Sequence, residues 1–320
     1  MKERLTTGLK IVVSLALIAW IFSRVDLAEV GRHLASAKIP YLLAAVVVYL
    51  AAIVVNGVKW QILLRAQKVA IPFPALLRFL FIGFFFNNLL PANVGGDVMR
   101  GYGLARYTDR AAEAAVSVVV DRIIGLMAYL STAAIAAIVA VNFAGFKNLQ
   151  QVEWLAFAAL LAVGLLFAAF MSRRLRGIIT RILSWRFLAR LAPVWKSVSN
   201  GLNAYRFNYG ALLSSLLVAL VGIACTTLVN WLLSQSMGGH MPLLSILMFN
   251  PLIALVLMIP ISIGGLGVSQ NIYPFFYSLV GVPDWHSLAV SLVMQLVVIA
   301  GGLPGGILWL RRRSSPPAGA

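Results

Sequence analysis

The long uncharged runs constrain this chain more than any other feature of its sequence. A helix needs about 20 consecutive apolar residues to cross the hydrocarbon core of a bilayer. Seven runs without Lys, Arg, Asp or Glu meet or approach that length, and they span residues 11–23, 39–58, 79–96, 123–146, 154–172, 207–283 and 285–310. The sixth run has 77 residues and must enter the membrane more than once. The pattern predicts an all-helical integral membrane bundle.

Composition excludes several other classes of protein. Apolar residues make up 61% of the chain and charged residues 11%, whereas soluble domains have roughly 45–50% and 25%. A net charge of +17 in a soluble chain would suggest nucleic acid as a partner, but here the basic residues stand between the apolar runs. The single cysteine, Cys225, lies inside an apolar stretch and allows no disulfide framework. Secreted, disordered and nucleic-acid-binding classes are therefore excluded.

Basic residues in the short loops predict the orientation, because loops rich in Lys and Arg stay in the cytoplasm. Residues 173–206 hold eight basic residues and no acidic one. The expected arrangement has about eight membrane segments, namely six full crossings and two re-entrant or broken hairpins, with both termini cytoplasmic in a cell (inner) membrane. It leaves only four basic residues outside, Arg24, Arg32, Lys38 and Lys147. Residues 1–313 then form one transmembrane domain, followed by a disordered tail over 314–320.

An internal repeat supports the same arrangement. Residues 90–96 and 259–265, offset by 169 positions, share the pattern aliphatic, Pro, any residue, Asn or Ser, Val or Ile, Gly, Gly. The predicted topology makes the first segment enter from the cytoplasm and the second from outside, as in the inverted repeats of transporters. We expect the two tips to approach each other at a polar cavity near the midplane, since broken helices at that depth need polar surroundings. The alternative is that Pro and Gly only kink packed helices.

A cavity between these tips would suit a phosphate group. Gly-Gly pairs let backbone N–H groups converge on an anion, and an arginine supplies a planar fork for phosphate oxygens. The candidate substrate-binding residues are Asn88, Asn93, Gly95, Gly96, Asp97, Arg100, Asp121, Arg122, Ser262, Gly264, Gly265 and Gln270. The alternative for Asp97 and Arg100, three positions apart, is a local ion pair at the membrane interface.

The adjacent charges Asp121 and Arg122 interrupt an apolar stretch. If their helix begins near Ala112, Asp121 lies about 14 Å along it. Charges at such depth face a bundle interior or water, and sequence neighbours on a helix do not face each other. Each should therefore have its own partner. The alternative is a helix that starts later, with both groups at the interface.

Signatures of an enzyme are missing from the sequence. It has no Walker A sequence, no HExxH and no GxSxG, and its three histidines, His33, His240 and His286, are scattered among predicted extracytoplasmic loops. We expect no catalytic residues, no metal and no cofactor. Gly301 and Gly305 form a GxxxG in the last span, which indicates close helix packing rather than dimerisation.

The segments NNLLPANVGGDVMRGYGLAR (87–106) and MIPISIGGLGVSQN (258–271) resemble the lysylphosphatidylglycerol synthase transmembrane-region family. Members are also called flippase-like proteins and include the membrane half of the multiple peptide resistance factor. Lys59-Trp60 before Leu63-Leu64 and the Asp121-Arg122 pair are further similarities. The resemblance implies a multi-helix membrane protein that moves lipids with polar head groups between leaflets.

Two departures limit what the resemblance implies. Full synthases carry a soluble aminoacyl-transfer domain after the helices, and the chain given ends at Ala320, so aminoacylation of lipid is not expected. Relatives often end the second motif with Arg-Glu, where this sequence has Ser269 and Gln270. If that acid serves proton coupling or lipid-amine recognition in relatives, this chain lacks it.

The sequence favours a lipid translocase whose substrate is an anionic or polyprenyl-phosphate-linked lipid or glycolipid. One alternative is a non-transporting partner of a glycosyltransferase or of a lipid-modifying enzyme. A less favoured alternative is a lipid-modifying membrane transferase, which would need an acid–base or metal constellation. The nine acidic residues spread along the chain do not indicate one.

Overall fold

All regular elements in the described part of the protein are α-helices. The computed structural model describes residues 31–32, 35–89, 94–143, 145, 150–172, 177, 181, 195, 199, 201–259, 262 and 264–313. The predicted tail, 314–320, and the first uncharged run, 11–23, lie outside these residues. Within them the all-helical prediction is confirmed.

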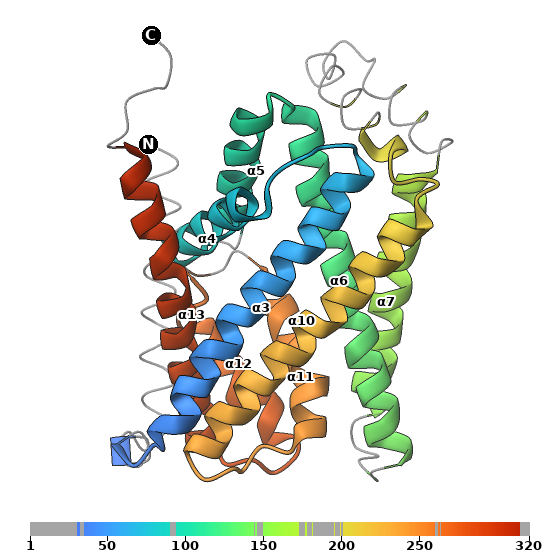
Figure 1. Ribbon diagram of the computed structural model, residues 1–320. Coiled ribbons are helices and arrows are strands. Elements are labelled where there is room, and N and C mark those ends of the chain that lie inside the picture. The colour runs from blue at the N-terminus through green and yellow to red at the C-terminus, as the bar shows by residue number, and fades with distance from the viewer. Residues whose placement is uncertain are drawn as a thin grey trace, which may run out of the picture.

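Four described helices are long and apolar enough to cross a membrane, and they run between the two ends of the bundle (Figure 1). They are α3 (Ile39–Ala66), α6 (Ala111–Asn142), α10 (Tyr209–Ser236) and α13 (Asp284–Arg313). The shortest of them have 28 residues, or about 42 Å at ~1.5 Å per residue, which exceeds the bilayer core. α3, α6 and α13 each continue past at least one end of their uncharged runs, so charged residues such as Lys59 become part of a spanning helix.

The remaining helices are shorter, and two pairs of them occupy opposite ends of the bundle. They are α4 (Phe73–Leu89), α5 (Val94–Thr108), α7 (Gln150–Met171), α11 (Leu243–Leu257) and α12 (Val268–Ser278). Figure 1 shows α4 and α5 toward the upper end and α11 and α12 toward the lower end. Run 79–96, a candidate span, is therefore divided between α4 and α5.

Both Pro-Gly motifs coincide with breaks between helices. The chain leaves α4 at Leu89 and enters α5 at Val94, and it leaves α11 at Leu257 and enters α12 at Val268. Residues 90–93, 260–261 and 263 lie outside the described residues. The alternative of merely kinked, continuous helices is wrong at both places.

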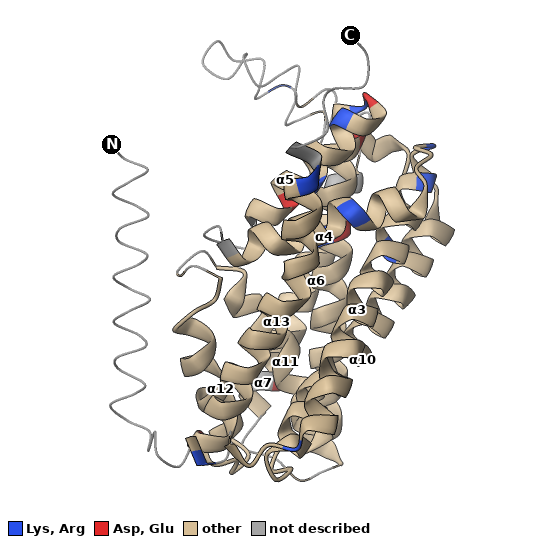
Figure 2. Ribbon diagram, turned by 60° about the vertical axis from the view of Figure 1, so that its left-hand side comes forward, with Lys and Arg blue, Asp and Glu red and all other residues tan. Residues whose placement is uncertain are grey.

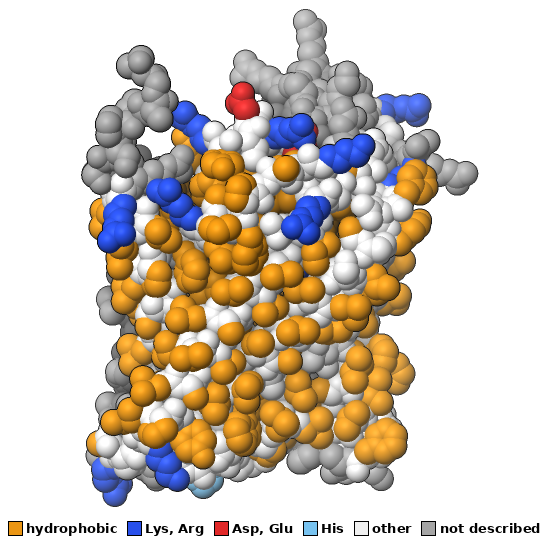
Figure 3. Space-filling view, viewed as in Figure 1, with side chains coloured by type: hydrophobic (Ala, Val, Ile, Leu, Met, Phe, Trp, Pro, Cys, Tyr) orange, Lys and Arg blue, Asp and Glu red, His pale blue; other side chains and the backbone are white. Residues whose placement is uncertain are grey.

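The surface of the bundle has the polarity that a bilayer requires. Large apolar side chains are exposed along its long helices, as Leu43, Val47 and Leu217 illustrate. Figure 3 shows an apolar band on one face, with most of the visible basic side chains near its upper end, and Figure 2 shows the same bias in the ribbon. The described chain is thus an integral membrane protein by composition and by the placement of its charges.

Glycines let α13 approach its neighbours closely. A Cβ atom at Gly305 would overlap with the carbonyl oxygen of Phe81 in α4, and one at Gly301 would stand 2.5 Å from the ring of Tyr49 in α3. The GxxxG in the last span therefore serves packing within the chain, as its sequence indicates.

Replacing Gly305 by alanine should destabilise the protein by about 1–3 kcal/mol or more, because the new methyl group can only be accommodated by separating α13 from α4. Gly164→Ala in α7 is the matched control, since nothing lies within 4 Å of its Cβ position. Thermal unfolding in detergent measures both variants. Equal stability of the two would show that α13 and α4 do not pack as described.

Candidate functional site

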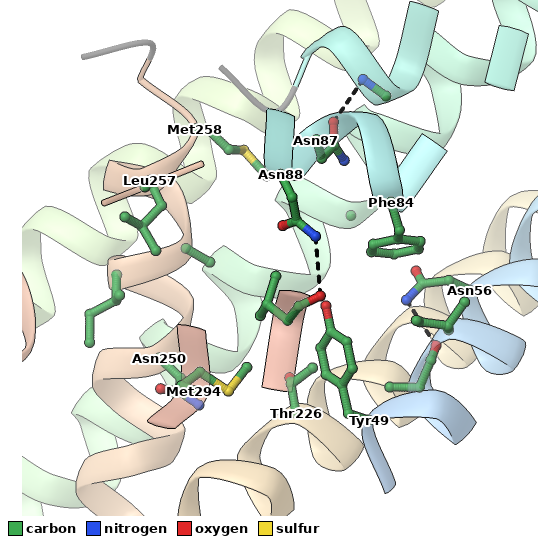
Figure 4. A pocket seen from close by; sticks show the side chains of 18 of the residues that line it. Tyr49, Asn56, Phe84, Asn87, Asn88, Thr226, Asn250, Leu257, Met258 and Met294 are labelled. Carbon is green, nitrogen blue, oxygen red and sulfur yellow. Dashed lines mark hydrogen bonds between the residues drawn. The ribbon is translucent and has the colours of Figure 1, made fainter. Parts of the chain in front are cut away.

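A cavity of about 330 Å³ lies inside the bundle, where helices from both halves of the chain meet. Its walls come from α3, α4, α5, α6, α10, α11, α12 and α13. Figure 4 shows polar side chains that line it, among them Asn56, Asn87, Asn88 and Asn250, together with apolar ones such as Phe84.

Five charged side chains at one end of this cavity form what we call the ion cluster. Its members are Lys59, Asp97, Arg100, Asp121 and Arg122, and all five line the cavity. Asp121 forms an ion pair with Lys59 Nζ at 3.0 Å and accepts a hydrogen bond from Arg100 Nη2 at 2.8 Å. Asp97 pairs with Arg100 at 2.9 Å and with the Nε of Arg122. Arg100 therefore bridges both carboxylates.

Helix geometry explains why these residues meet. Asp97 lies in the first turn of α5 and Arg100 three positions later, so both side chains share one face of that helix. Asp121 and Arg122 are adjacent on α6 and point in different directions. As expected, each has its own acidic or basic partners, with Asp121 joined to Lys59 and Arg122 joined to Asp97.

The start of α6 decides between two sequence alternatives. The helix begins at Ala111, so Asp121 lies about 15 Å from that end at ~1.5 Å per residue. The alternative of a later helix start, with both charges at the interface, is wrong. Asp121 is 5% exposed and lies in the bundle interior.

The ion cluster is largely buried. Lys59, Arg100 and Asp121 are each less than a tenth exposed. The Arg100 guanidinium also lies over the ring of Trp60, 4.8 Å from its centroid, and the Trp60 N–H donates to Ser117 Oγ at 3.0 Å. Among the described residues, three cations against two carboxylates leave one surplus positive charge in the ion cluster. Charges held away from water need nearby partners of opposite charge. The cavity is therefore electrostatically suited to an anion.

The first glycine motif has a packing role. The N–H of Gly96 donates to Asn87 Oδ1 at 2.8 Å, so Asn87 of α4 caps the start of α5. A Cβ at Gly96 would overlap with the carbonyl oxygen of Gly83. The prediction that the Gly95-Gly96 N–H groups converge on an anion is thus wrong for Gly96 in this structure, because a side chain already uses that N–H.

The second glycine motif forms a turn that meets the end of α4. Gly264, Gly265 and Gly267 have φ of +58°, +79° and +80°, in the left-handed region that favours glycine. Gly264 and Gly265 line the cavity. A Cβ at Gly264 would stand 3.1 Å from the carbonyl oxygen of Asn88, so the two motif regions are in contact.

The structure brings most of the predicted site residues to the cavity. Those that line it are Asn88, Gly96, Asp97, Arg100, Asp121, Arg122, Gly264 and Gly265. Gly95, Ser262 and Gln270 are described but are not among its lining residues. Gln270 instead accepts from the N–H of Gly267 at 2.7 Å and so supports the turn. Asn93 lies outside the described residues.

Sequence reasoning missed Lys59 as a site residue. The sequence did contain an indication of a buried charge, because Lys59 directly follows a 20-residue uncharged run and stands six positions before the next charge, Arg65. Only the tertiary structure pairs it with Asp121, 62 positions later. The neutral polar lining from α10 and α13 also escaped, since single Asn, Thr or Gln residues within apolar helices are common.

The histidines differ from their predicted distribution. His240 and His286 are not scattered, because their rings lie 4.9 Å apart, and His286 is fully buried against Ser234 Oγ at 2.9 Å. His286 lies in the first turn of α13, which begins at Asp284, rather than in a loop. Among described residues, no three His, Cys, Asp or Glu side chains gather as metal ligands would.

The fold and the cavity together define a polytopic α-helical membrane protein with a buried, net positive polar cavity. The chain belongs to the lysylphosphatidylglycerol synthase transmembrane-region family, which it matches over residues 8–305. It is similar to a UPF0104 membrane protein of Methanothermobacter thermautotrophicus, with 25% identity over 90% of this chain and 89% of that one. It is also similar to a UPF0104 membrane protein of Pyrococcus horikoshii, with 22% identity over 95% of this chain and 97% of that one.

Proposed function

We propose that this protein is a lipid translocase that moves a phosphate-bearing lipid between the leaflets of the cell membrane. The head group would pass through the cavity while the acyl or prenyl chains stay in the bilayer. The observation that carries the proposal is the ion cluster, a buried group of three cations and two carboxylates that lines the cavity. Family membership supports a role linked to lipids.

Electrostatics explains why a phosphate is the favoured ligand. An anion leaving water needs fixed cations and hydrogen-bond donors to replace its hydration. Arg100 and Arg122 both contact Asp97, the more exposed of the two carboxylates in the cluster, with 14% of its side chain accessible. A phosphate could replace that carboxylate between the two guanidinium groups.

The two helix pairs support an alternating-access mechanism built on an inverted repeat. α4–α5 and α11–α12 lie toward opposite ends of the bundle, and each pair is broken at a Pro-Gly motif (Figure 1). In transporters of this architecture, one repeat moves against the other around a central site. We propose six crossings and two re-entrant hairpins, as the distribution of Lys and Arg predicts.

Both termini and the segment 173–206 should be cytoplasmic. In a Cys225→Ala background, a cysteine replacing Asn203 should react with a membrane-impermeant maleimide only from the cytoplasmic side, and one replacing Lys38 only from outside. Both native side chains are exposed. Labelling of the Asn203 position from outside would contradict the proposed topology.

Leaflet exchange of a fluorescent phosphatidylglycerol in proteoliposomes tests the function. The protein should accelerate exchange over empty liposomes, and an Arg100→Ala, Arg122→Ala double variant should abolish the acceleration when rates are normalised to folded protein. Unchanged activity of that variant would rule out the ion cluster as the phosphate site.

A further inference from the structure

The cavity has a second end whose polar lining carries no charge. Side chains from four helices form it, and we call them the amide–hydroxyl set: Thr226, Asn230, Asn250, Ser269, Tyr273 and Gln295. In Figure 4, Thr226 and Asn250 lie at the opposite end of the pocket from Asn87. Asn87 contacts Gly96, which precedes Asp97 of the ion cluster. The cavity lining therefore combines the ion cluster with a neutral polar set, of which Thr226 and Asn250 lie away from Asn87.

The amide–hydroxyl set has hydrogen-bonding capacity left for a ligand. Ser269 is 5% exposed, and its Oγ has no hydrogen-bond partner in the described part of the chain. Asn230 accepts from Tyr273 at 2.9 Å and donates to the Thr226 carbonyl at 3.0 Å, which leaves one amide hydrogen and one lone pair. Buried polar groups without partners are costly unless a ligand or water satisfies them.

A cationic head group finds no free carboxylate among the described residues that line this cavity. Asp97 and Asp121 are the acidic residues among the described lining residues, and each already binds two cations. An ammonium group would also meet the surplus positive charge of the ion cluster. Uncharged hydroxyl groups, in contrast, both donate to and accept from amides and hydroxyls.

We infer that the group attached to the phosphate is neutral and rich in hydroxyls, as in a sugar or polyol, and that the amide–hydroxyl set binds it. This inference rests on the proposed function, because it assumes that the ion cluster binds the phosphate. It separates this protein from a carrier of aminoacylated, cationic lipid.

Binding of matched lipids to the purified full-length protein tests the inference. The probes are phosphatidylinositol, phosphatidic acid and lysylphosphatidylglycerol with identical acyl chains, and a glucosyl diacylglycerol without phosphate. Competition measured by native mass spectrometry should rank phosphatidylinositol about fivefold or more above phosphatidic acid, with the lysylated lipid weakest among the phospholipids. The glucosyl diacylglycerol should also bind more weakly than phosphatidylinositol. Equal or tighter binding of the lysylated lipid would overturn the inference.

Variants separate this inference from the proposed function. Asn250→Leu should reduce the preference for phosphatidylinositol over phosphatidic acid to about onefold while phosphatidic acid binds as before. Ser269→Ala is a smaller change and should reduce this preference about two- to threefold. It provides the test of the inference if the Asn250→Leu protein does not fold. Asn142→Leu, at an exposed amide at the far end of α6, should leave the preference unchanged. An unaltered preference in both cavity variants would contradict the inference.

The double variant Arg100→Ala, Arg122→Ala distinguishes the two failures. If the double variant binds all three phospholipids equally more weakly, the ion cluster is supported as the phosphate site. The affinity ranking of the lipids then tests the head-group inference by itself. If it weakens none of them, the proposed function fails, and the inference fails with it.

Discussion

Replacing Arg100 by lysine should lower the rate of lipid translocation about tenfold or more while most of the protein remains folded. Arg100 contacts both Asp97 and Asp121 and lies over the Trp60 ring. A lysine keeps the charge but loses the planar fork, so it cannot bind Asp121 and a phosphate in the same geometry. Leaflet exchange in proteoliposomes, normalised to folded protein, gives the rate.

Arg65→Lys is the matched control for this variant. Arg65 is exposed in the last turn of α3 and does not line the cavity, so its replacement should leave the rate unchanged. Equal rates for the Arg100→Lys variant and the native protein would show that bidentate geometry is unimportant.

Replacing Asp121 by asparagine should destabilise the protein by about 3–5 kcal/mol, the usual cost of removing one partner from a buried ion pair. Asp121 has two cationic partners, Lys59 and Arg100, and all three side chains are buried. Without it, three cations of the cluster face only Asp97. The midpoint of thermal unfolding in detergent measures the loss.

A second substitution shows whether the loss comes from uncompensated charge. Lys59→Met in the Asp121→Asn background removes one unpaired cation, so it should recover part of the stability, whereas Lys59→Met alone should be destabilising. Asp109→Asn is the control, since Asp109 is exposed and its φ of +57° suits asparagine. Additive effects of the two cluster substitutions would mean that Lys59 and Asp121 are not coupled.

Transport measured on the same variants separates structure from function. If the Asp121→Asn, Lys59→Met protein is stable and still moves lipid, then this pair serves folding, and Arg100 with Arg122 serves the ligand. If it is stable and inactive, Asp121 takes part in the transport cycle.

The helices of this fold were predictable from the sequence where hydrophobicity alone determines their positions. Uncharged runs located α3, α6, α10 and α13, since the bilayer allows only helices of sufficient apolar length to cross. The two Pro-Gly motifs correctly marked where α4 and α11 end, because Pro and paired Gly do not continue a helix at low cost. Helix ends were less predictable, since α3 continues to Ala66, eight residues beyond the end of its uncharged run at residue 58.

The partners of the buried charges needed the tertiary structure. The sequence identified Asp97, Arg100, Asp121 and Arg122 as charges near the cavity, but it could not show that Arg100 bridges both carboxylates. The sequence also could not indicate that Asn87 accepts a hydrogen bond from the N–H of Gly96, since that bond depends on how closely α4 and α5 approach each other.

By itself the sequence determined that this is a helical membrane protein with polar breaks at two related positions, because bilayer thickness and backbone hydrogen bonding permit little else for such a chain. The tertiary structure alone decided which charges and amides share one cavity. Asp121 is 62 positions from Lys59 and 21 from Arg100 in sequence. Contacts over such separations follow from helix packing, which depends on residue shape, such as the missing Cβ of Gly305 and the ring of Tyr49, rather than on hydrophobicity.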